Sequence, residues 1–391
     1  MTNKEIMQNK ALWERVSAFN PQSPIRIGKP FEPDSKTVDA LEYLDDGSVM
    51  VRMYAPTAGT VTIGSGGIAV YKFKVELQRR EDGVFEGAIP ANKSLRGNIV
   101  VECQVDGATV IHPYLPVQFY GGRIANFIEV PDWETPYILL NDVPHGSVNR
   151  EIFWSETVGS WQRCMVYTPP MYQEGGEYPV LYLQHGGGEN ETGWVFNGKL
   201  PYILDNVLAE SKGVPFIVVM NDGLVKVPGQ TGTNDFDGIE GIITKDCRKF
   251  IETRYRVKTD KWNRAIAGLS LGSMQASYIG MGHPELFASI GSFTYLRCRD
   301  KDNTHEGNPH LNVLRDPERF WKDYKLLFRS LGECERSVNE FADDDELIRS
   351  CGIDKNPGYV RKMYPEMTHD WNCWRRAIYD FAQVVFRAPG R

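Results

Sequence analysis

Gly268, Ser270 and Gly272 form a Gly-x-Ser-x-Gly sequence inside "NRAIAGLSLGSMQAS", residues 263–277. The apolar run "RAIAG" precedes the serine, and "SMQASYIGMG", a segment typical of a helix, follows it. A sharp turn from strand to helix needs small flanking residues and presents the serine hydroxyl at the carboxyl end of a sheet. The pattern and its context predict that Ser270 is a nucleophile. A Gly- and Ser-rich turn without chemistry is the alternative.

A serine hydroxyl is a poor nucleophile at neutral pH, so Ser270 needs a histidine that accepts its proton and an acid that orients the histidine. Where this turn lies on an α/β sheet, the order along the chain is serine, acid, histidine. Four histidines follow Ser270: His283, His305, His310 and His369. His283 is typical of a helix end, and His305 and His310 lie in a polar loop. His369 precedes the final amphipathic segment, so we expect it to be the base.

The acid is expected at the end of the preceding strand. The apolar run "YKLLFRSLG" ends at Gly332, which leaves Glu333 and Glu335 near the strand tip. Glu335 is favoured because a Gly-x-x-acid spacing turns the carboxylate back toward the sheet, and Glu333 remains the alternative. The acidic residues 343–345 are expected to begin a solvated helix.

An acyl-transfer site also needs amide donors for the developing oxyanion. The amide of Leu271, directly after the serine, is one candidate. Gly187 and Gly188, in the Gly-rich stretch after the strand "VLYLQ", are the others. Such a stretch could instead cradle phosphate, but it lacks both the P-loop ending and the Gly-x-Gly-x-x-Gly spacing. No His-x-x-x-His pair occurs, so we expect neither a metal nor any other cofactor.

The elements that must position these residues are nearly continuous apolar strands separated by amphipathic helices. Such strands are typical of a sheet covered by helices on both faces. The pattern predicts an α/β domain with a mostly parallel sheet over residues 145–391. The expected strands are residues 178–186, 214–222, 264–268, 286–293 and 324–332, and the expected helices are residues 201–213, 241–255 and 374–386.

The segment from 37 to 130 has a different pattern, with short alternating runs bounded by Gly, Pro and Asp-Gly. This period of 2 predicts a small β-sandwich of immunoglobulin-like size. Residues 1–36, with a helix expected around Leu12, Trp13 and Val16, form an N-terminal arm. Residues 131–144 form a linker.

Composition limits the partners and the compartment. The formal net charge of −7 argues against nucleic acid, because binding phosphates requires a basic surface. No apolar run approaches the roughly 20 residues of a membrane span, and the first residues lack the apolar core of a secretory signal. We therefore expect no membrane partner and a cytoplasmic location, or secretion if a signal was trimmed. Seven cysteines without a Cys-x-x-Cys pair favour a reducing compartment.

With these residues placed, the chain resembles the esterase family that contains feruloyl esterases, acetylxylan esterases, S-formylglutathione hydrolases and enterochelin esterases. The resemblance covers nearly all of residues 145–391. It rests on "VYTPPMYQEGGEYPVLYLQHGGGENETGW", "ILDNVLAESKGVPFIVVMNDG", "FIETRYRVKTDKWNRAIAGLSLGSMQA" and "THDWNCWRRAIYDF". It implies an α/β-hydrolase fold, with Ser270 matching the family nucleophile, His369 the base and Glu335 the acid.

The N-terminal segment resembles the immunoglobulin-like module that precedes such esterases and is related to carbohydrate-binding modules. Two positions depart from the family pattern. Ser273 replaces the second glycine that is common after the nucleophile, a change that should be tolerated. Phe85 stands where many of these modules have tryptophan, so the resemblance does not imply glycan binding by the module.

The resemblance implies ester hydrolysis through an acyl-enzyme. The first expectation is a feruloyl esterase acting on ester-linked plant saccharides, because tryptophans near the expected catalytic loops would suit a hydroxycinnamoyl group. Trp194, Gln275 and Trp371 are the expected substrate contacts, whereas Trp374 is expected to be a core anchor. The alternatives are an acetylxylan esterase, an enterochelin esterase, or a saccharide-binding protein without catalysis. A homo-oligomer is compatible with the sequence.

Overall fold

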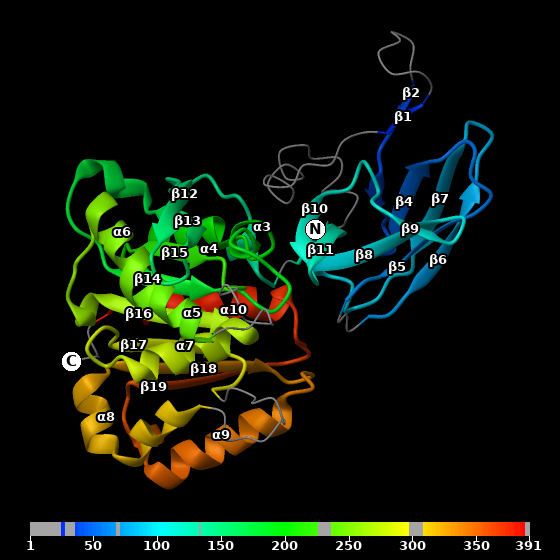
Figure 1. The fold of residues 1–391 in the computed structure, drawn as a ribbon. Helices are drawn as coiled ribbons and strands as arrows, with labels where there is room; N and C mark the ends of the chain where they lie inside the picture. The colour runs from blue at the N-terminus through cyan, green and yellow to red at the C-terminus, as the bar shows by residue number, and fades with distance from the viewer. Residues whose placement is uncertain are drawn as a thin grey trace. The chain divides into compact units, whose positions relative to one another are not determined.

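The computed structural model describes residues 25–27, 36–67, 71–132, 134–225, 236–296 and 308–387. The chain divides into two compact units, Met1–Asn141 and Asp142–Arg391, and each unit is described by itself (Figure 1). The division falls close to residue 145, where the sequence pattern begins the α/β domain. The helix expected around Leu12 and the histidine at position 305 lie outside the described residues.

The N-terminal unit is built from antiparallel strands. β6 pairs with β5 through residues 74–77 and with β7 through residues 78–79, so it joins two halves of one sheet. The strands are β1 (Ile25–Ile27), β2 (Lys36–Val38), β3 (Leu41–Tyr43), β4 (Val49–Tyr54), β5 (Val61–Ser65), β6 (Lys74–Arg79), β7 (Val84–Ile89), β8 (Gly97–Val105), β9 (Ala108–Val110), β10 (Val117–Tyr120) and β11 (Arg123–Val130).

The core of this unit extends into the expected arm. Buried Val51 from one half and Ile63 and Val101 from the other belong to one apolar cluster, in agreement with the alternation that predicted a β-sandwich. Ile25 of β1 is fully buried in the same cluster. Residues 25–27 therefore belong to the β domain, since β1 pairs with β2 and buries its first side chain.

The C-terminal unit contains an eight-stranded sheet in the order β12-β13-β15-β14-β16-β17-β18-β19. The pairs β12–β13 and β13–β15 are antiparallel, and the pairs from β15 to β19 are parallel. The strands are β12 (Ser147–Ser155), β13 (Ser160–Thr168), β14 (Val180–Gln184), β15 (Ile217–Asn221), β16 (Arg264–Leu269), β17 (Ser289–Phe293), β18 (Leu326–Gly332) and β19 (Tyr359–Tyr364).

Helices cover both faces of this sheet (Figure 1). A Cβ added at Gly280 of α7 would meet Ile290 of β17, and one added at the next strand residue, Gly291, would meet Phe381 of α10. Neighbouring strand residues point to opposite faces, so α7 and α10 lie on opposite sides. The α-helices are α3 (Gly193–Phe196), α4 (Leu200–Ala209), α5 (Phe236–Gly241), α6 (Arg248–Arg254), α7 (Leu271–Gly282), α8 (Pro317–Asp323), α9 (Val338–Cys351) and α10 (Trp371–Ala382).

Short 3₁₀ and π-helical segments occur in the C-terminal unit and, at residues 136–138, just before it. Ile242–Cys247 (η3) is a π-helical turn between α5 and α6, so the helix expected over 241–255 is part of a longer, irregular one. The 3₁₀ segments are η1 (Pro136–Ile138), η2 (Pro170–Glu174), η4 (Lys261–Asn263), η5 (Pro309–Arg315) and η6 (Ile353–Lys355). None of the helices in the described ranges is long and apolar enough to cross a membrane.

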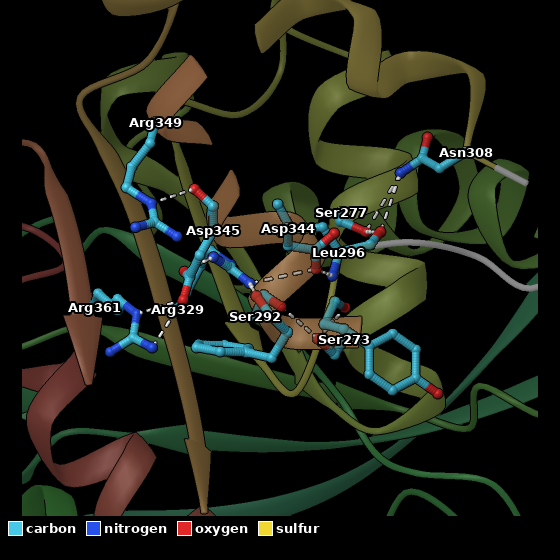
Figure 2. Close-up of polar contacts among 12 residues, drawn as sticks. Ser273, Ser277, Ser292, Leu296, Asn308, Arg329, Asp344, Asp345, Arg349 and Arg361 are labelled. Carbon is cyan, nitrogen blue, oxygen red and sulfur yellow. Dashed lines mark hydrogen bonds and ion pairs between the residues drawn. The ribbon is translucent and has the colours of Figure 1, made fainter. Parts of the chain in front are cut away.

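The expected solvated helix start at residues 343–345 is wrong, because α9 begins at Val338 and only Asp343 of the three is exposed. Asp344 and Asp345 lie in the middle of α9 and are buried. Arg329 of β18, itself fully buried, donates to Asp345 at 2.6 Å and contacts Asp344 at 3.3 Å (Figure 2). A buried guanidinium needs paired carboxylates, and this tertiary requirement places both residues inside.

Candidate active site

The backbone at Ser270 has the conformation that a strand-to-helix turn requires. Its φ of 50° and ψ of −118° are rarely adopted by a residue with a side chain. A Cβ at Gly268 would collide with the carbonyl of Gly272, and a Cβ at Gly272 would lie 2.5 Å from the His185 carbonyl oxygen. Both glycines are therefore required by close backbone approach, and the turn they permit directs the Ser270 side chain away from the sheet.

Ser270, His369 and Glu335 form a continuous chain of hydrogen bonds. His369 Nε2 lies 2.9 Å from Ser270 Oγ, and His369 Nδ1 lies 2.8 Å from Glu335 Oε2. The Glu335 side chain is fully buried, and its Oε1 accepts from the amide of Gly332 at 3.3 Å. The Gly-x-x-acid turn expected after β18 is thus present. The three side chains have the geometry in which a histidine accepts the serine proton while a carboxylate orients it.

The other candidates lie elsewhere. Glu333, the alternative acid, is exposed, and its backbone amide bonds to Tyr364. His283 ends α7 and contacts Glu240 and Glu285. His310 packs against the ring of Tyr278. The structure therefore brings Glu335 and His369 to Ser270, and it leaves Glu333, His283 and His310 out of this group.

The Gly-rich stretch after β14 lies beside the serine. We call residues 185–189 the donor loop. A Cβ at Gly186 would be 3.4 Å from the Ser270 Cβ, so this backbone passes directly alongside Ser270. Gly187 is exposed, and a Cβ there would meet no described atom within 4 Å. Gly188 has a φ of 75°, which favours glycine. Leu271 begins α7, so its amide points from the positive end of that helix.

Glu189, which the sequence analysis did not single out, bonds both the donor loop and the segment that contains His369 and Trp371. Its fully buried carboxylate accepts from the Gly186 amide at 3.0 Å and from the Trp371 indole at 2.9 Å. Burial raises the pKa of this carboxyl, although the nearby His185 and the two N–H donors oppose that effect. Trp371 opens α10, two residues after His369. One side chain thus contacts both the donor loop and the segment that carries His369.

We expect Glu189→Gln to lower kcat about 100-fold with a smaller change in KM. Glutamine has only one side-chain oxygen, so it cannot accept from both Gly186 and Trp371, and the donor loop would shift. Steady-state kinetics on an ester substrate measures this. Glu151→Gln is the matched control, since that buried carboxylate bonds Arg254 and Tyr255 instead. Equal kcat values for wild type and Glu189→Gln would contradict the positioning role.

Asp370, next to His369, is a second buried acid that the sequence analysis did not single out. Its Oδ1 caps α10 by accepting from the amides of Asn372 and Cys373. Burial raises the pKa of this carboxyl from 3.8 to about 6. The unfolded chain therefore holds fewer protons than the folded one between these values, and stability falls as pH rises through this window.

We expect Asp370→Asn to gain stability relative to the wild type as pH rises from 4 to 7, by up to about 3 kcal/mol. Asparagine keeps the capping oxygen but does not ionise. Urea unfolding at both pH values gives the two free-energy differences. A difference that is constant with pH would show that the carboxyl does not titrate in this way.

The structure places the three expected substrate contacts in the core, and their role in binding stays a prediction. Trp194 and Trp371 are 1% and 2% exposed, and they pack edge to face with ring centroids 5.2 Å apart. Gln275 is also buried, and its Nε2 donates to the Gly223 carbonyl at 2.9 Å. Trp374, the expected core anchor, is buried as well and packs against the His369 ring. The buried aromatic residues thus pack against one another and against His369.

Ser273, at the position where the family often has glycine, is fully buried and satisfied. Its Oγ lies 2.7 Å from the Ser292 hydroxyl and donates to the Tyr295 carbonyl at 3.0 Å (Figure 2). The change from glycine is thus accommodated by two partners. Within the described ranges, no group of three or more His, Cys, Asp or Glu side chains is arranged to hold a metal ion.

Comparison with known proteins places this geometry among esterases. A family model described as "Putative esterase" matches residues 155–382. The chain is 31% identical over 357 residues to an endo-1,4-beta-xylanase/feruloyl esterase of Xylanibacter ruminicola, covering 88% of this chain and 45% of that protein. It is 23% identical over 275 residues to endo-1,4-beta-xylanase Y of Acetivibrio thermocellus, covering 64% of this chain and 24% of that protein. The chain thus spans less than half the length of these relatives.

Two groups of solved structures share the fold. A ferulic acid esterase of Anaeromyces mucronatus superposes with a TM-score of 0.54 at 22% identity, covering 63% of this chain and 93% of that one. The enterobactin esterase of Shigella flexneri superposes with a TM-score of 0.59 at 13% identity, covering 97% of this chain and 98% of that one. The C-terminal unit therefore has an α/β-hydrolase type of fold.

Proposed function

The chain belongs to the "Putative esterase" family, and from this premise we propose that it is a serine carboxylic-ester hydrolase that releases hydroxycinnamate from plant saccharide esters. The observation that carries the reaction type is the hydrogen-bonded chain from Ser270 through His369 to buried Glu335. The relative that is 31% identical, a xylanase/feruloyl esterase, supports the choice of ester.

In the first half of the reaction, Ser270 Oγ attacks the carbonyl carbon of the ester as its proton passes to His369 Nε2. Glu335 holds the imidazole in orientation and stabilises its positive charge. The carbonyl oxygen becomes an oxyanion that the amides of Leu271, Gly187 and Gly188 are proposed to stabilise. The intermediate then collapses with cleavage of the bond between the acyl carbon and the saccharide oxygen, His369 gives its proton to that leaving oxygen, and an acyl ester remains on Ser270.

In the second half, a water molecule takes the place of the alcohol. His369 removes its proton as the oxygen attacks the acyl carbon, and the same donors stabilise the second oxyanion. Collapse of this intermediate returns the proton to Ser270 Oγ and releases the carboxylic acid. No cofactor takes part in either half.

An enterobactin-type trilactone esterase is a second candidate, and one observation favours it. The structural match to the Shigella flexneri enzyme extends over both units of this chain, whereas the ferulic acid esterase matches 63% of it. The reaction at Ser270 would be unchanged, and only the ester would differ. Acetylxylan remains a third ester for the same machinery.

A substrate panel on the purified full chain tests the proposal. Methyl ferulate, a feruloylated arabinoxylo-oligosaccharide, acetylated xylan and a catecholate siderophore trilactone are compared by kcat/KM. The proposal expects the two feruloyl esters to be preferred. Preference for the trilactone would replace the proposed substrate, and absence of turnover of every ester would contradict the reaction type.

A further inference from the structure

The hairpin of β12 and β13, at one edge of the catalytic sheet, carries an exposed tryptophan pair. Trp154 and Trp161 are directly opposite each other in the antiparallel register, with ring centroids 5.6 Å apart in an edge-to-face arrangement. They are 44% and 68% exposed, and Ile152 on the same face is 61% exposed. Single exposed apolar side chains are common on protein surfaces, but adjoining large ones are characteristic of binding surfaces.

The opposite face of the hairpin is anchored. Phe153 is buried and stacks on Phe250 of α6. Ser155 Oγ donates to Asp246 at 2.5 Å, and the Thr157 amide donates to the same carboxylate at 3.1 Å. The turn is therefore fixed to the helix beneath it. A fixed backbone presents the two indole rings with little ordering cost on binding.

Strand register places the tryptophan pair at the same end of the sheet as Ser270. Val166 of β13, Val219 of β15, Tyr182 of β14 and Ile266 of β16 form one row across the sheet. Because β13 is antiparallel to β16, the stretch of β13 from Val166 back to Trp161 runs in the same direction as the stretch of β16 from Ile266 forward to Ser270. Both Trp161 and Ser270 therefore lie beyond this row at one end of the sheet. Three strand spacings separate the two strands, on the order of 14 Å.

Direct contacts connect the hairpin face to the segment beside Ser270. Arg163 and Arg150 lie on the tryptophan-bearing face and reach the buried carboxylate of Glu191 at 2.8 and 3.3 Å. Glu191 follows the donor loop by two residues. Arg163 also pairs with Asp222 at 2.8 Å. The two cations are thus balanced by two anions, and this surface suits a neutral ligand better than a charged one.

From these observations we propose that Trp154 and Trp161 form a saccharide-binding platform for the polysaccharide chain that carries the ester. This inference rests on the proposed function. Indole rings offer large flat apolar faces, which match the C–H faces of sugar rings, and the neighbouring arginines offer donors to sugar hydroxyls. The separation from Ser270 spans several sugar rings, so the platform would bind the chain beyond the feruloylated residue.

The test compares Trp154→Ala, Trp161→Ala and the double variant with the wild type. For each protein, kcat/KM is measured on methyl ferulate, which has no sugar, and on feruloylated arabinoxylo-oligosaccharides of increasing length. We expect the ratio of oligosaccharide to methyl ferulate activity to fall about tenfold in the variants, mainly through KM. The loss should appear only for oligosaccharides long enough to reach the hairpin.

Trp262→Ala is the matched control. Trp262 is also 44% exposed, but it lies in η4, just before β16, at the amino end of the sheet. Its substitution should leave the ratio unchanged. A variant ratio equal to that of the wild type, or an equal loss on methyl ferulate and long oligosaccharides, would overturn the platform while the proposed function stands.

A binding measurement separates the platform from the proposed function. Migration of the wild type in gels that contain arabinoxylan should be retarded, and the Trp154→Ala/Trp161→Ala protein should lose this retardation whatever its esterase activity. Retardation that persists in the double variant would overturn the platform. A change of oligomeric mass in that variant, measured by small-angle scattering, would assign the surface to contacts between copies of the chain and also overturn it.

Discussion

Replacing Ser270 with alanine is expected to lower kcat by about 10⁶-fold, the typical cost of losing the nucleophile of a serine triad. The variant should fold, because alanine occupies less space than serine and the turn is set by Gly268 and Gly272. Steady-state and single-turnover kinetics on methyl ferulate measure the loss. Circular dichroism and the thermal midpoint check the fold.

Ser273→Ala is the control for this variant. Ser273 lies one helical turn further along α7, and its hydroxyl bonds Ser292 and Tyr295 rather than His369. Its substitution should keep kcat within a few-fold of the wild type and lower the stability by about 1 kcal/mol. A Ser270→Ala protein that retains wild-type kcat would remove the proposed nucleophile.

Glu335→Gln is expected to lower kcat by about 10⁴-fold. The amide would no longer neutralise the imidazolium that forms when His369 takes the Ser270 proton, and it would favour the wrong imidazole tautomer. The Glu335 carboxylate is fully buried at 2.8 Å from His369, so solvent cannot take over its interaction with the imidazolium in the variant without rearrangement. Measurement of kcat across the pH range separates this loss from a shift of the optimum.

Glu333→Gln is the matched control, because this glutamate is two residues away on the same strand end and is exposed. We expect its kcat to equal that of the wild type. If Glu333→Gln lost activity and Glu335→Gln kept it, the acid of the triad would be wrongly assigned. Double substitution should be no worse than Glu335→Gln alone.

Local sequence patterns predicted the parts of the structure that depend on local geometry. The apolar runs for β14 to β18 and the turn at Ser270 were located because a sheet covered on both faces needs continuous apolar strands, and a sharp turn needs glycines. The contact between His369 and Glu335 followed from chain order combined with the Gly-x-x-acid turn after β18.

The sequence pattern could not predict features that depend on contacts between segments distant in the sequence. Trp194 and Trp371 lie in or beside catalytic loops, and nothing local distinguishes a substrate contact from a core anchor. Asp344 and Asp345 resemble a solvated helix start until Arg329 is known to be buried opposite them. The hairpin of β12 and β13 was missed, because polar and apolar residues do not alternate in "SVNREIFWS" or "SWQRCMVYT".

Two positioning residues could have been found by asking which acids adjoin the expected loops. Glu189 follows the glycines of the donor loop and Asp370 follows the base. An acid directly before a helical segment is a common cap, which identifies Asp370 as an N-cap. The double acceptor role of Glu189 requires knowledge that Trp371 lies against it.

Covalent labelling tests the central claim, an activated Ser270, most directly. The full chain is treated with a fluorophosphonate, and the modified residue is identified by peptide mass spectrometry. We predict one adduct, on Ser270, with labelling abolished in Ser270→Ala and strongly slowed in Glu335→Gln. Absence of an adduct on Ser270 in the folded wild type, or an adduct on another residue alone, would contradict the account.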